Sequence, residues 1–403
     1  MTPSLRLVFW ETTKACNLSC RHCRAVPQRH LGPTELTTKR ALDLIDDIAK
    51  VAKPVMVLSG GEPLFRPDLF DIAAYGVESG FRMALATNGT LVTERVAAKI
   101  ADAGFSRVAV SLDSANPDTH DRFRGQPGAH ALAMRGLSNL RDQGVSVQIN
   151  STITKHNVGE VQQMLDMALG IGADALHLFM LVPVGCGLEI PENEMLPAEE
   201  YERVLGWFDE RSKDCPIDLK ATCAPHYYRI RAQRIEEERS RGDLSSTFIA
   251  PGTRAKAAPT LLGRGGHGQH LSAMTRGCLA GTSVCFISNE GAVYPCGYLP
   301  VSAGDTRTER FADIWSGSPV FQQLRNPKAL DGKCGACRYE ALCGGCRARA
   351  YAATGSFLAE EPFCSYRPDL DVPRFSSLGP RIPLAMSHEI RVTSNDPPVG
   401  GVS

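Results

Sequence analysis

Three cysteines, Cys16, Cys20 and Cys23, lie in the eight-residue stretch CNLSCRHC. Cysteine thiolates are the usual ligands of iron–sulfur clusters, and this spacing lets one loop hold three corners of an iron–sulfur cube. A structural zinc ion closes its coordination with four protein ligands, so three cysteines alone argue against zinc. The stretch therefore predicts an iron–sulfur site with one metal position left open for another ligand.

A second group of eight cysteines lies nearer the carboxyl terminus. Its members are Cys278, Cys285, Cys296, Cys334, Cys337, Cys343, Cys346 and Cys364. Two C-x2-C pairs in this group are separated by five residues, a spacing that a zinc ribbon and iron–sulfur ligation explain equally well. Between the two groups lie Cys186, Cys215 and Cys223. We expect Cys186 to be a small apolar filler, with a substrate-contacting thiol as the alternative, and His226 to be a hydrogen-bonded surface residue.

The composition limits the class of protein. The 403 residues are 43% hydrophobic, which suits one large domain and a smaller one. Lys plus Arg and Asp plus Glu both number 44, so the charge gives no reason to expect nucleic-acid binding. The apolar start, LRLVFW, is too short for a signal peptide, and no apolar run is long enough for a membrane span. We expect a cytoplasmic protein, whose 14 cysteines bind metal or do chemistry rather than form disulfides.

The first two thirds of the sequence alternate short apolar runs with helical patterns. Expected strands cover residues 5–11, 54–59, 81–87, 106–113, 145–153 and 175–183. Expected helices cover residues 36–51, 68–79, 95–104, 131–144 and 158–172. This alternation is typical of parallel βαβ units with right-handed crossovers. Six such strands form either an open doubly wound sheet or an incomplete barrel.

Residues that could bind a ligand follow these strands at their carboxyl ends. The cysteine triplet follows the first strand, and GGEP at 60–63 follows the second. The corresponding positions further along the chain are Asn88, Ser111, Asp113, Asn150, Met180 and Leu181. Ligand sites of α/β folds lie at the carboxyl ends of the strands, so we expect all these residues around one mouth.

CNLSCRHC after the first strand, together with GGEP after the second, resembles the radical S-adenosylmethionine family. The resemblance implies an α/β fold, namely a partial (βα)6 barrel with a small cysteine-rich iron–sulfur domain at the carboxyl-terminal side. It also implies a 4Fe–4S cluster on the cysteine triplet, with its fourth corner chelated by the amino and carboxylate groups of S-adenosylmethionine. The residues expected to bind S-adenosylmethionine are Gly60, Gly61, Glu62, Pro63, Asn88, Ser111, Asp113, Met180 and Leu181.

Within this resemblance, several of these residues have an expected contact. The two glycines let the backbone approach the methionine part closely, because glycine has no Cβ. Glu62 is expected to hold the ammonium group. Ser111 and Asp113 match positions that hydrogen-bond the nucleoside or the carboxylate, and Met180 or Leu181 is expected to line the adenine. The sequence assigns no catalytic residue.

The second cysteine group resembles the SPASM extension of the same family. Gly291 and Cys296 enclose four residues, and C-x2-C-x5-C with a distant last cysteine follows. This resemblance implies two auxiliary 4Fe–4S clusters. The first set of ligands would be Cys278, Cys285, Cys296 and Cys346. The second set would be Cys334, Cys337, Cys343 and Cys364. The extension usually ends in C-x3-C, whereas Cys343 and Cys346 enclose two residues.

We expect four segments along the chain. Residues 1–230 would form the radical barrel, and residues 277–367 the auxiliary-cluster domain. Residues 231–276 are rich in charge and glycine and would form a linker or a lid on the substrate side. Residues 368–403 lack sustained periodicity and would form a loosely ordered tail.

Several longer stretches, among them KATCAPHYYRI and CGGCRARAYAATG, resemble the heme-biosynthesis branch of the family. That resemblance implies a radical oxidoreductase, which cleaves S-adenosylmethionine to a 5′-deoxyadenosyl radical. Its reaction would be oxidative decarboxylation of tetrapyrrole propionates in alternative heme or heme d1 biosynthesis. A reductase, flavodoxin or ferredoxin would donate electrons. Candidate partners for the propionates are Arg24, Arg66, Arg122 and Arg124.

One departure and two alternatives concern the substrate. Residues 183–187 read PVGCG where the branch usually reads PTGRG, which removes an arginine that could pair with a carboxylate. One alternative is a SPASM maturase that modifies a ribosomally made peptide. Such enzymes often carry a peptide-binding domain before the barrel, for which a first strand near residue 5 leaves no room. The alternative of another class is a zinc-stabilised binding protein.

Overall fold

A computed structural model describes residues 4–190, 192–242 and 277–368 of the chain. Its strands are β1 (Leu7–Glu11), β2 (Val55–Ser59), β3 (Arg82–Thr87), β4 (Arg107–Ser111), β5 (Val147–Ile153), β6 (Ala175–Met180), β7 (Asp218–Thr222), β8 (Val284–Ile287), β9 (Ala292–Tyr294) and β10 (Gly304–Asp305). They form one sheet in the order β10-β9-β8-β1-β2-β3-β4-β5-β6-β7. The strands from β8 through β1 to β7 pair in parallel, whereas β9 pairs antiparallel with β8 and β10.

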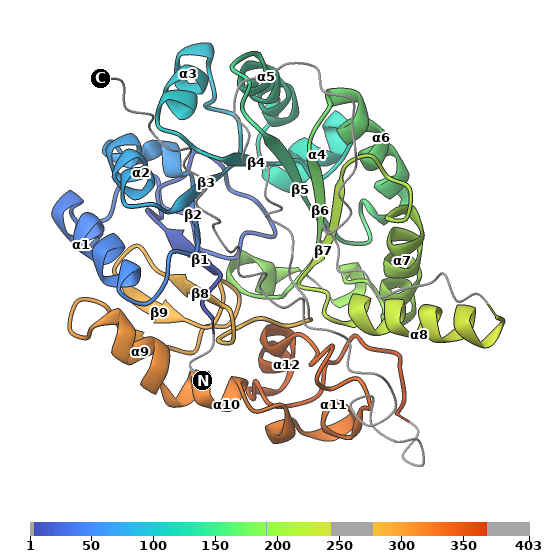
Figure 1. Cartoon of the computed structure of the whole chain (residues 1–403). Coiled ribbons are helices and arrows are strands. Elements are labelled where there is room, and N and C mark those ends of the chain that lie inside the picture. Colours follow the sequence, from blue (N-terminus) through green and yellow to red (C-terminus); the bar gives the residue numbers. More distant parts are fainter. Residues whose placement is uncertain (1–3, 191, 243–276, 369–403) are drawn as a thin grey trace, which may run out of the picture.

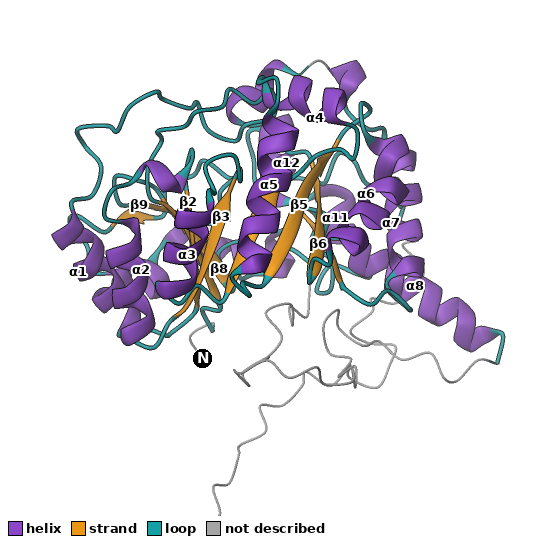
Figure 2. Ribbon diagram, turned by 90° about the horizontal axis from the view of Figure 1, so that it is seen from above, coloured by secondary structure: helices purple, strands orange, loops and turns teal. Residues whose placement is uncertain are grey.

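Twelve α-helices accompany this sheet in the described residues. They are α1 (Thr38–Ala49), α2 (Leu69–Glu78), α3 (Glu94–Asp102), α4 (Pro117–Arg124), α5 (Ala129–Asp142), α6 (Val161–Ile171), α7 (Ala198–Arg211), α8 (His226–Ser240), α9 (Phe311–Gly317), α10 (Pro319–Leu324), α11 (Gly332–Ala336) and α12 (Arg347–Thr354). Figure 1 shows α1 to α3 and α5 to α8 along an outer arc around the strands, with α4 inside this arc and α9 to α12 on the remaining side. In Figure 2, α1 to α3 lie at one end of the row and α6 to α8 at the other.

Along each strand, successive side chains alternate between the face of the sheet that the helices cover and the face that lines the interior. In β1, Val8 and Trp10 are fully buried in the core, whereas Leu7 and Phe9 are half-buried and line a cavity. Successive side chains of a strand point to opposite faces, which produces this period of two. Amphipathic helices cover the outward-facing row of side chains. The first of them, α1, begins where the Thr37 side chain accepts a hydrogen bond from the Arg40 N–H.

The predicted fold class is confirmed, with two additions. The six expected strands are present as β1 to β6. A seventh parallel strand, β7, extends the row, and β8 joins β1 at the other edge. No pairing joins β7 to β8 among the described residues, so the barrel is incomplete.

Two features of the structure bear on the expected domain boundaries. Helix α8 runs from His226 to Ser240, so the boundary predicted at residue 230 falls inside a continuous helix. Strand β8 belongs to the segment expected to form the second domain, yet it pairs with the first strand of the barrel. The rest of the predicted linker or lid, residues 243–276, and almost all of the predicted tail, residues 369–403, lie outside the described residues.

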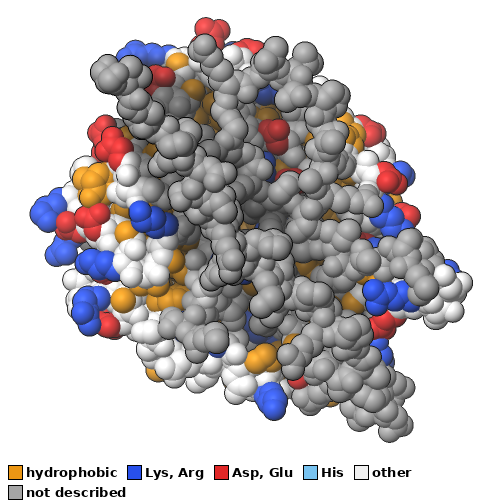
Figure 3. Space-filling model, viewed as in Figure 1, with side chains coloured by type: hydrophobic (Ala, Val, Ile, Leu, Met, Phe, Trp, Pro, Cys, Tyr) orange, Lys and Arg blue, Asp and Glu red, His pale blue; other side chains and the backbone are white. Residues whose placement is uncertain are grey.

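Two surface features bear on the expected partners. None of the described helices has the length and apolar character that a membrane crossing requires. On the face shown in Figure 3, basic and acidic side chains are interspersed around the described margin. This mixture agrees with the equal numbers of acidic and basic residues in the sequence.

Candidate active site

The strand ends open into one cavity of about 360 Å³, whose wall contains residues from every strand from β1 to β8. The predicted site residues that line it are Cys16, Cys20, Cys23, Gly60, Gly61, Asn88, Ser111, Met180, Leu181, Cys278, Cys296 and Cys346. The other eight predicted residues are not among the lining residues, namely Glu62, Pro63, Asp113, Cys285, Cys334, Cys337, Cys343 and Cys364. The strand ends therefore share one mouth, while the individual roles assigned to these residues stay predictions.

The cysteine triplet lies in a loop that follows β1. Its side chains pack with Leu18 in a small buried cluster. The Leu18 N–H donates a hydrogen bond to the Cys16 sulfur over 3.4 Å, and Arg124 Nη1 donates to the Cys20 sulfur over 3.8 Å. Burial raises the pKa of Cys16 to about 11, so a bound cation is needed to hold its thiolate at neutral pH. Donors aimed at the sulfurs and burial together suit a metal cluster.

Gly60 and Gly61 fit this loop against the end of β2. A Cβ at Gly60 would lie 2.6 Å from the carbonyl oxygen of Thr13, and one at Gly61 would lie 2.6 Å from that of Lys14. The Gly61 N–H also donates to the Thr13 carbonyl over 2.7 Å. The glycines were expected to admit the methionine part of the cofactor. The structure shows that the protein's own backbone already requires them.

Glu62 lies behind the cavity wall, where both its carboxylate oxygens accept hydrogen bonds. Oε1 accepts from Thr87 Oγ1 over 2.8 Å and from the Leu64 N–H over 3.2 Å, and Oε2 accepts from the Asn88 N–H over 2.7 Å. Burial raises the pKa of Glu62 to about 7 against the effect of these bonds. These bonds link the ends of β2 and β3, and the expected contact of Glu62 with an ammonium group stays a prediction. Pro63 is buried beside it.

Asp113 is also engaged inside the protein. Its Oδ2 lies 2.7 Å from Arg124 Nε, and its Oδ1 accepts a hydrogen bond from the Thr152 N–H over 2.8 Å. Burial opposes ionisation, but the charge of Arg124 holds the pKa of Asp113 below its usual value. His22 Nε2 lies 3.6 Å from Oδ2, and burial lowers the pKa of His22 to about 4, so the ring is neutral at pH 7. Asp113 thus ties the cysteine loop to α4 and β5.

Three cysteines of the second group line the same cavity as the first group. These are Cys278, Cys296 and Cys346. Cys285 does not join them, because it lies in β8 opposite Val8 of β1, in the row of side chains that faces the outer helices. It is fully buried in that core. Its predicted place among the cluster ligands is therefore not supported by its orientation.

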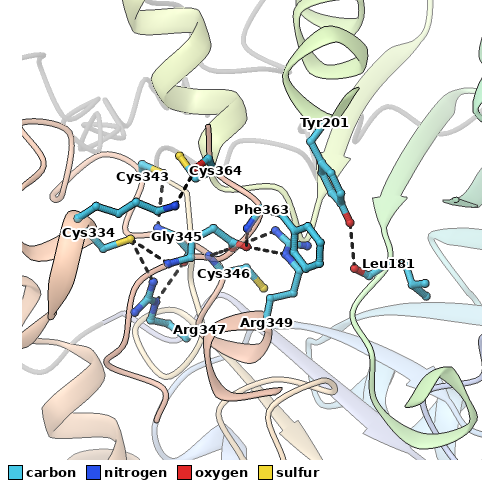
Figure 4. A network of polar contacts seen from close by, with 12 residues as sticks. Leu181, Tyr201, Cys334, Cys343, Gly345, Cys346, Arg347, Arg349, Phe363 and Cys364 are labelled. Atoms are coloured by element: carbon cyan, nitrogen blue, oxygen red, sulfur yellow. Dashed lines mark hydrogen bonds and ion pairs between the residues drawn. The ribbon is translucent and has the colours of Figure 1, made fainter. Parts of the chain in front are cut away.

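The other four cysteines of the second group line a second cavity. They are Cys334, Cys337, Cys343 and Cys364. Figure 4 shows two of the groups that donate to their sulfurs, Arg347 Nη2 to Cys334 over 3.6 Å and the Gly345 N–H to Cys343 over 3.5 Å. His226 is fully buried and lines this cavity, so the expectation of a surface histidine is wrong.

Both cavities have the chemistry that iron–sulfur clusters require. Thiols converge from several loops, and N–H donors surround them, as expected around iron–sulfur ligands. No three His, Cys, Asp or Glu side chains converge on a single-ion site in the described part of the chain. A cubane distributes its thiolates over separate irons, so these thiols fit clusters better than they fit a zinc ion.

A buried ion pair connects the two cavities. Arg349 and Glu361 are 0% and 1% exposed, and Arg349 Nε lies 2.9 Å from Glu361 Oε1. Glu361 Oε2 also accepts the N–H of Cys346 over 2.7 Å, at the residue that precedes α12. Because Cys346 lines the first cavity and Glu361 lines the second, the pair fixes the two sites relative to each other.

The four arginines expected to meet propionates have different environments. Arg24 and Arg124 line the first cavity, but each already pairs with a carboxylate of the protein. Arg66 is buried and donates to two backbone carbonyls and to Asp68. Arg122 is exposed. Two of the four predicted arginines thus line the cavity, and each of these two is also paired with a carboxylate of the protein.

Lys220 is a lining residue that the sequence reasoning missed. It lies in β7 opposite His177 of β6, and burial lowers its pKa to about 8. Within the described residues, its ammonium makes no hydrogen bond or ion pair. The signal that could have found it is the short DLKAT run, had that run been recognised as a strand of the barrel.

Comparisons with known proteins agree with this geometry. The Radical SAM superfamily model matches residues 10–168, and the SPASM model, an iron–sulfur cluster-binding domain, matches residues 278–346. The AdoMet-dependent heme synthase of Methanosarcina barkeri is 48% identical, over 91% of this chain and 98% of that protein. The pre-heme d1 synthase of Dinoroseobacter shibae is 32% identical, over 89% and 85%. Streptococcus suis SuiB bound to S-adenosylmethionine shares the fold, with a TM-score of 0.66 at 15% identity, over 90% and 78%.

The two matched segments coincide with the two groups of thiols. Residues 10–168 contain the cysteine triplet and the GGEP turn, and residues 278–346 contain all of the second group except Cys364. The cofactors are therefore 4Fe–4S clusters and S-adenosylmethionine, and the zinc-stabilised binding protein is not favoured. The chain belongs to the radical SAM superfamily, as an enzyme that carries a SPASM iron–sulfur cluster-binding domain.

Proposed function

We propose that this enzyme is a heme synthase, which oxidatively decarboxylates propionate groups of an iron tetrapyrrole to vinyl groups. The observation that carries the proposal is the 48% identity to a heme synthase, which extends over 98% of that protein. The likeness therefore includes both the barrel and the cysteine-rich domain. A pre-heme d1 synthase at 32% identity is consistent with the same branch.

The cavity supports a substrate that carries carboxylates. Lys220 lines the wall without a protein partner among the described residues, and burial disfavours its charged form. A propionate carboxylate against Lys220 would compensate the buried charge. We assign to Lys220 the binding of one propionate, which orients the neighbouring carbon atoms toward the cysteine triplet in the same cavity.

The reaction needs a hydrogen abstractor and an electron acceptor beside the same substrate. The bound cofactors supply a 5′-deoxyadenosyl radical and, at the auxiliary thiols, an electron acceptor. Each propionate loses one hydrogen atom from the carbon β to the carboxylate, carbon dioxide and one electron, which leaves a vinyl group. Cys16, Cys20 and Cys23 hold the cluster that binds S-adenosylmethionine, while Asp113 and Arg124 keep their loop in place.

Two further parts of the proposal concern the cell. A reductase, flavodoxin or ferredoxin is expected to supply electrons to the enzyme. We place the reaction in the cytoplasm, because cluster thiolates persist where thiols are kept reduced.

The test is an anaerobic incubation of the reduced, reconstituted enzyme with S-adenosylmethionine and either iron–coproporphyrin or didecarboxysiroheme. Mass spectrometry should show loss of two carbon dioxide molecules, together with two hydrogen atoms from each propionate, in step with 5′-deoxyadenosine. Cleavage of S-adenosylmethionine with an unchanged tetrapyrrole would overturn the proposal and favour a peptide substrate. The Cys16→Ala, Cys20→Ala, Cys23→Ala protein is the control, because it should neither cleave S-adenosylmethionine nor form product.

A further inference from the structure

Besides the triplet, four cysteines line the main cavity, and one of these four lies outside the SPASM segment. They are Cys223, Cys278, Cys296 and Cys346. Cys223, Cys296 and Cys346 also pack into one apolar cluster. The turn after β7 therefore brings Cys223 to the same cavity wall and the same apolar cluster as Cys296 and Cys346.

The backbone at Cys223 has an uncommon conformation. Its φ is +55°, and it is the only residue other than glycine with a positive φ in the described chain. Such a conformation is disfavoured for a residue with a Cβ and persists where the surrounding structure requires it, often at functional sites. Cys223 directly follows β7, at the carboxyl end of a barrel strand, and α8 begins three residues later. The turn between β7 and α8 thus presents this thiol to the cavity.

The segment that carries Cys278 packs onto the same turn. The Cys278 N–H donates to the carbonyl of Cys343 over 3.1 Å, which places Cys278 beside the turn that leads to Cys346. A Cβ at Gly277 would lie 2.8 Å from Pro225 Cβ, two residues after Cys223. The chain around Cys278 therefore fills the space between the β7–α8 turn and the Cys343–Cys346 turn.

Cys285 points away from this group. Its neighbours in β8, Val284 and Phe286, line the cavity, and successive side chains of a strand face opposite ways. Cys285 lies beside Val8 in the core under the helices. A ligand role would require β8 to turn over and expose Val284 and Phe286 to the helical side.

We propose that Cys223, in place of Cys285, is the fourth thiolate ligand of the auxiliary cluster held by Cys278, Cys296 and Cys346. Each thiol gives up its proton when it binds iron. One ligand then comes from a strand end of the barrel and three come from the SPASM segment, so the cluster joins the two parts at the mouth of the cavity. The inference rests on the family's auxiliary clusters and not on the identity of the substrate.

The test compares Cys223→Gly with Cys285→Ala. Glycine accepts a φ of +55°, so Cys223→Gly removes the thiol without adding backbone strain. Both changes are placed in the Cys16→Ala, Cys20→Ala, Cys23→Ala protein, which retains the auxiliary clusters alone. Iron, sulfide and the Mössbauer and EPR spectra are measured after anaerobic reconstitution, without tetrapyrrole. We expect Cys223→Gly to lose one cluster, or to retain it short of one iron, and Cys285→Ala to keep both clusters unchanged.

A third variant guards against a folding effect. Cys223→Ser offers an oxygen ligand of similar size, and we expect it to keep both clusters while the spectrum and potential of one of them shift. Cys215→Ser, at a cysteine outside both cavity walls, is the matched control. Unchanged clusters in Cys223→Gly, an unchanged spectrum in Cys223→Ser, or loss of a cluster in Cys285→Ala would each overturn the proposal. Because no substrate is present, these outcomes leave the heme synthase proposal to its own test.

Discussion

We expect the binding of a carboxylate substrate to depend most directly on Lys220. It lines the cavity, and it has no ion pair or hydrogen bond among the described residues. A charged hydrogen bond to a propionate is worth about 2 kcal/mol. We therefore expect Lys220→Met to raise the KM for the tetrapyrrole roughly 30-fold, while uncoupled cleavage of S-adenosylmethionine continues. The measurement is a pair of titrations that follow product and 5′-deoxyadenosine.

The control for this prediction is Lys53→Met, because Lys53 is exposed and lies outside the cavity wall. It should leave both quantities unchanged. An unaltered KM in the Lys220→Met protein would show that the propionates find their partners elsewhere. Loss of S-adenosylmethionine cleavage as well would point instead to damage at the cysteine loop.

The positions of some residues could be predicted from the sequence, and those of others could not. The spacing of Cys16, Cys20 and Cys23 is local, and the structure brings these three side chains together in one loop. Cys285 could not be placed from spacing, because its direction depends on the register of β8 against β1. Lys220 was missed for a related reason, since the direction of its side chain depends on the pairing of the short, polar β7 with β6.

At the scale of elements, the GGEP turn after β2 fixes the position of the cysteine loop after β1. A Cβ at Gly61 would collide with the carbonyl oxygens of Lys14 and Ala15. Gly61→Ala should therefore displace the loop, cost about 2 kcal/mol of stability and reduce iron at the first cluster, while the auxiliary clusters remain. Iron analysis and thermal unfolding check this expectation.

Gly206→Ala provides the matched glycine control. Gly206 lies inside α7, and a Cβ there would meet no atom within 4 Å. This change should raise the stability by about 0.5–1 kcal/mol, because alanine favours the helix. Full iron in the Gly61→Ala protein would mean that the cysteine loop can move without losing its ligand geometry.

Helix α12 depends on a carboxylate from outside the helix. Glu361 accepts the N–H of Cys346, which precedes the helix, and pairs with the buried Arg349. Glu361→Gln leaves the guanidinium without its counter-charge, so we expect the free energy of unfolding to fall by about 3 kcal/mol. Thermal unfolding of the reconstituted protein measures the loss. The exposed neighbour Glu360, as Glu360→Gln, should change stability far less; equal losses would contradict the role of the buried pair.

Two strands show why part of the fold could not be predicted from the sequence. The pattern of apolar runs and helices predicted β1 to β6, because each lies next to its partner in the chain. Strand β8 has four residues, Val284–Ile287, and pairs with β1, which it follows by more than half of the chain. Strand β7, Asp218–Thr222, contains two charged residues and resembles a loop. Short strands that pair over long distances leave no periodic signal.

At the scale of the whole molecule, the barrel and the cysteine-rich domain form one working unit. The cysteine-rich segment supplies β8 to the barrel sheet, and three of its cysteines line the barrel cavity. The second cavity, with Cys334, Cys337, Cys343 and Cys364, is separate from that cavity. This arrangement lets the initial cleavage of S-adenosylmethionine and the removal of the last electron depend on different cysteines.

Cys334→Ala with Cys337→Ala tests that division. Because these residues do not line the main cavity, the variant should still form 5′-deoxyadenosine, whereas the decarboxylated product should disappear for want of an electron acceptor. Metal binding also contributes to folding, so circular dichroism and iron content must show a folded protein that has lost one cluster. Cys215→Ala, outside both cavity walls, should behave like the unaltered enzyme. A folded double variant that still makes full product would contradict the electron-acceptor role, since the second cavity would then serve stability alone.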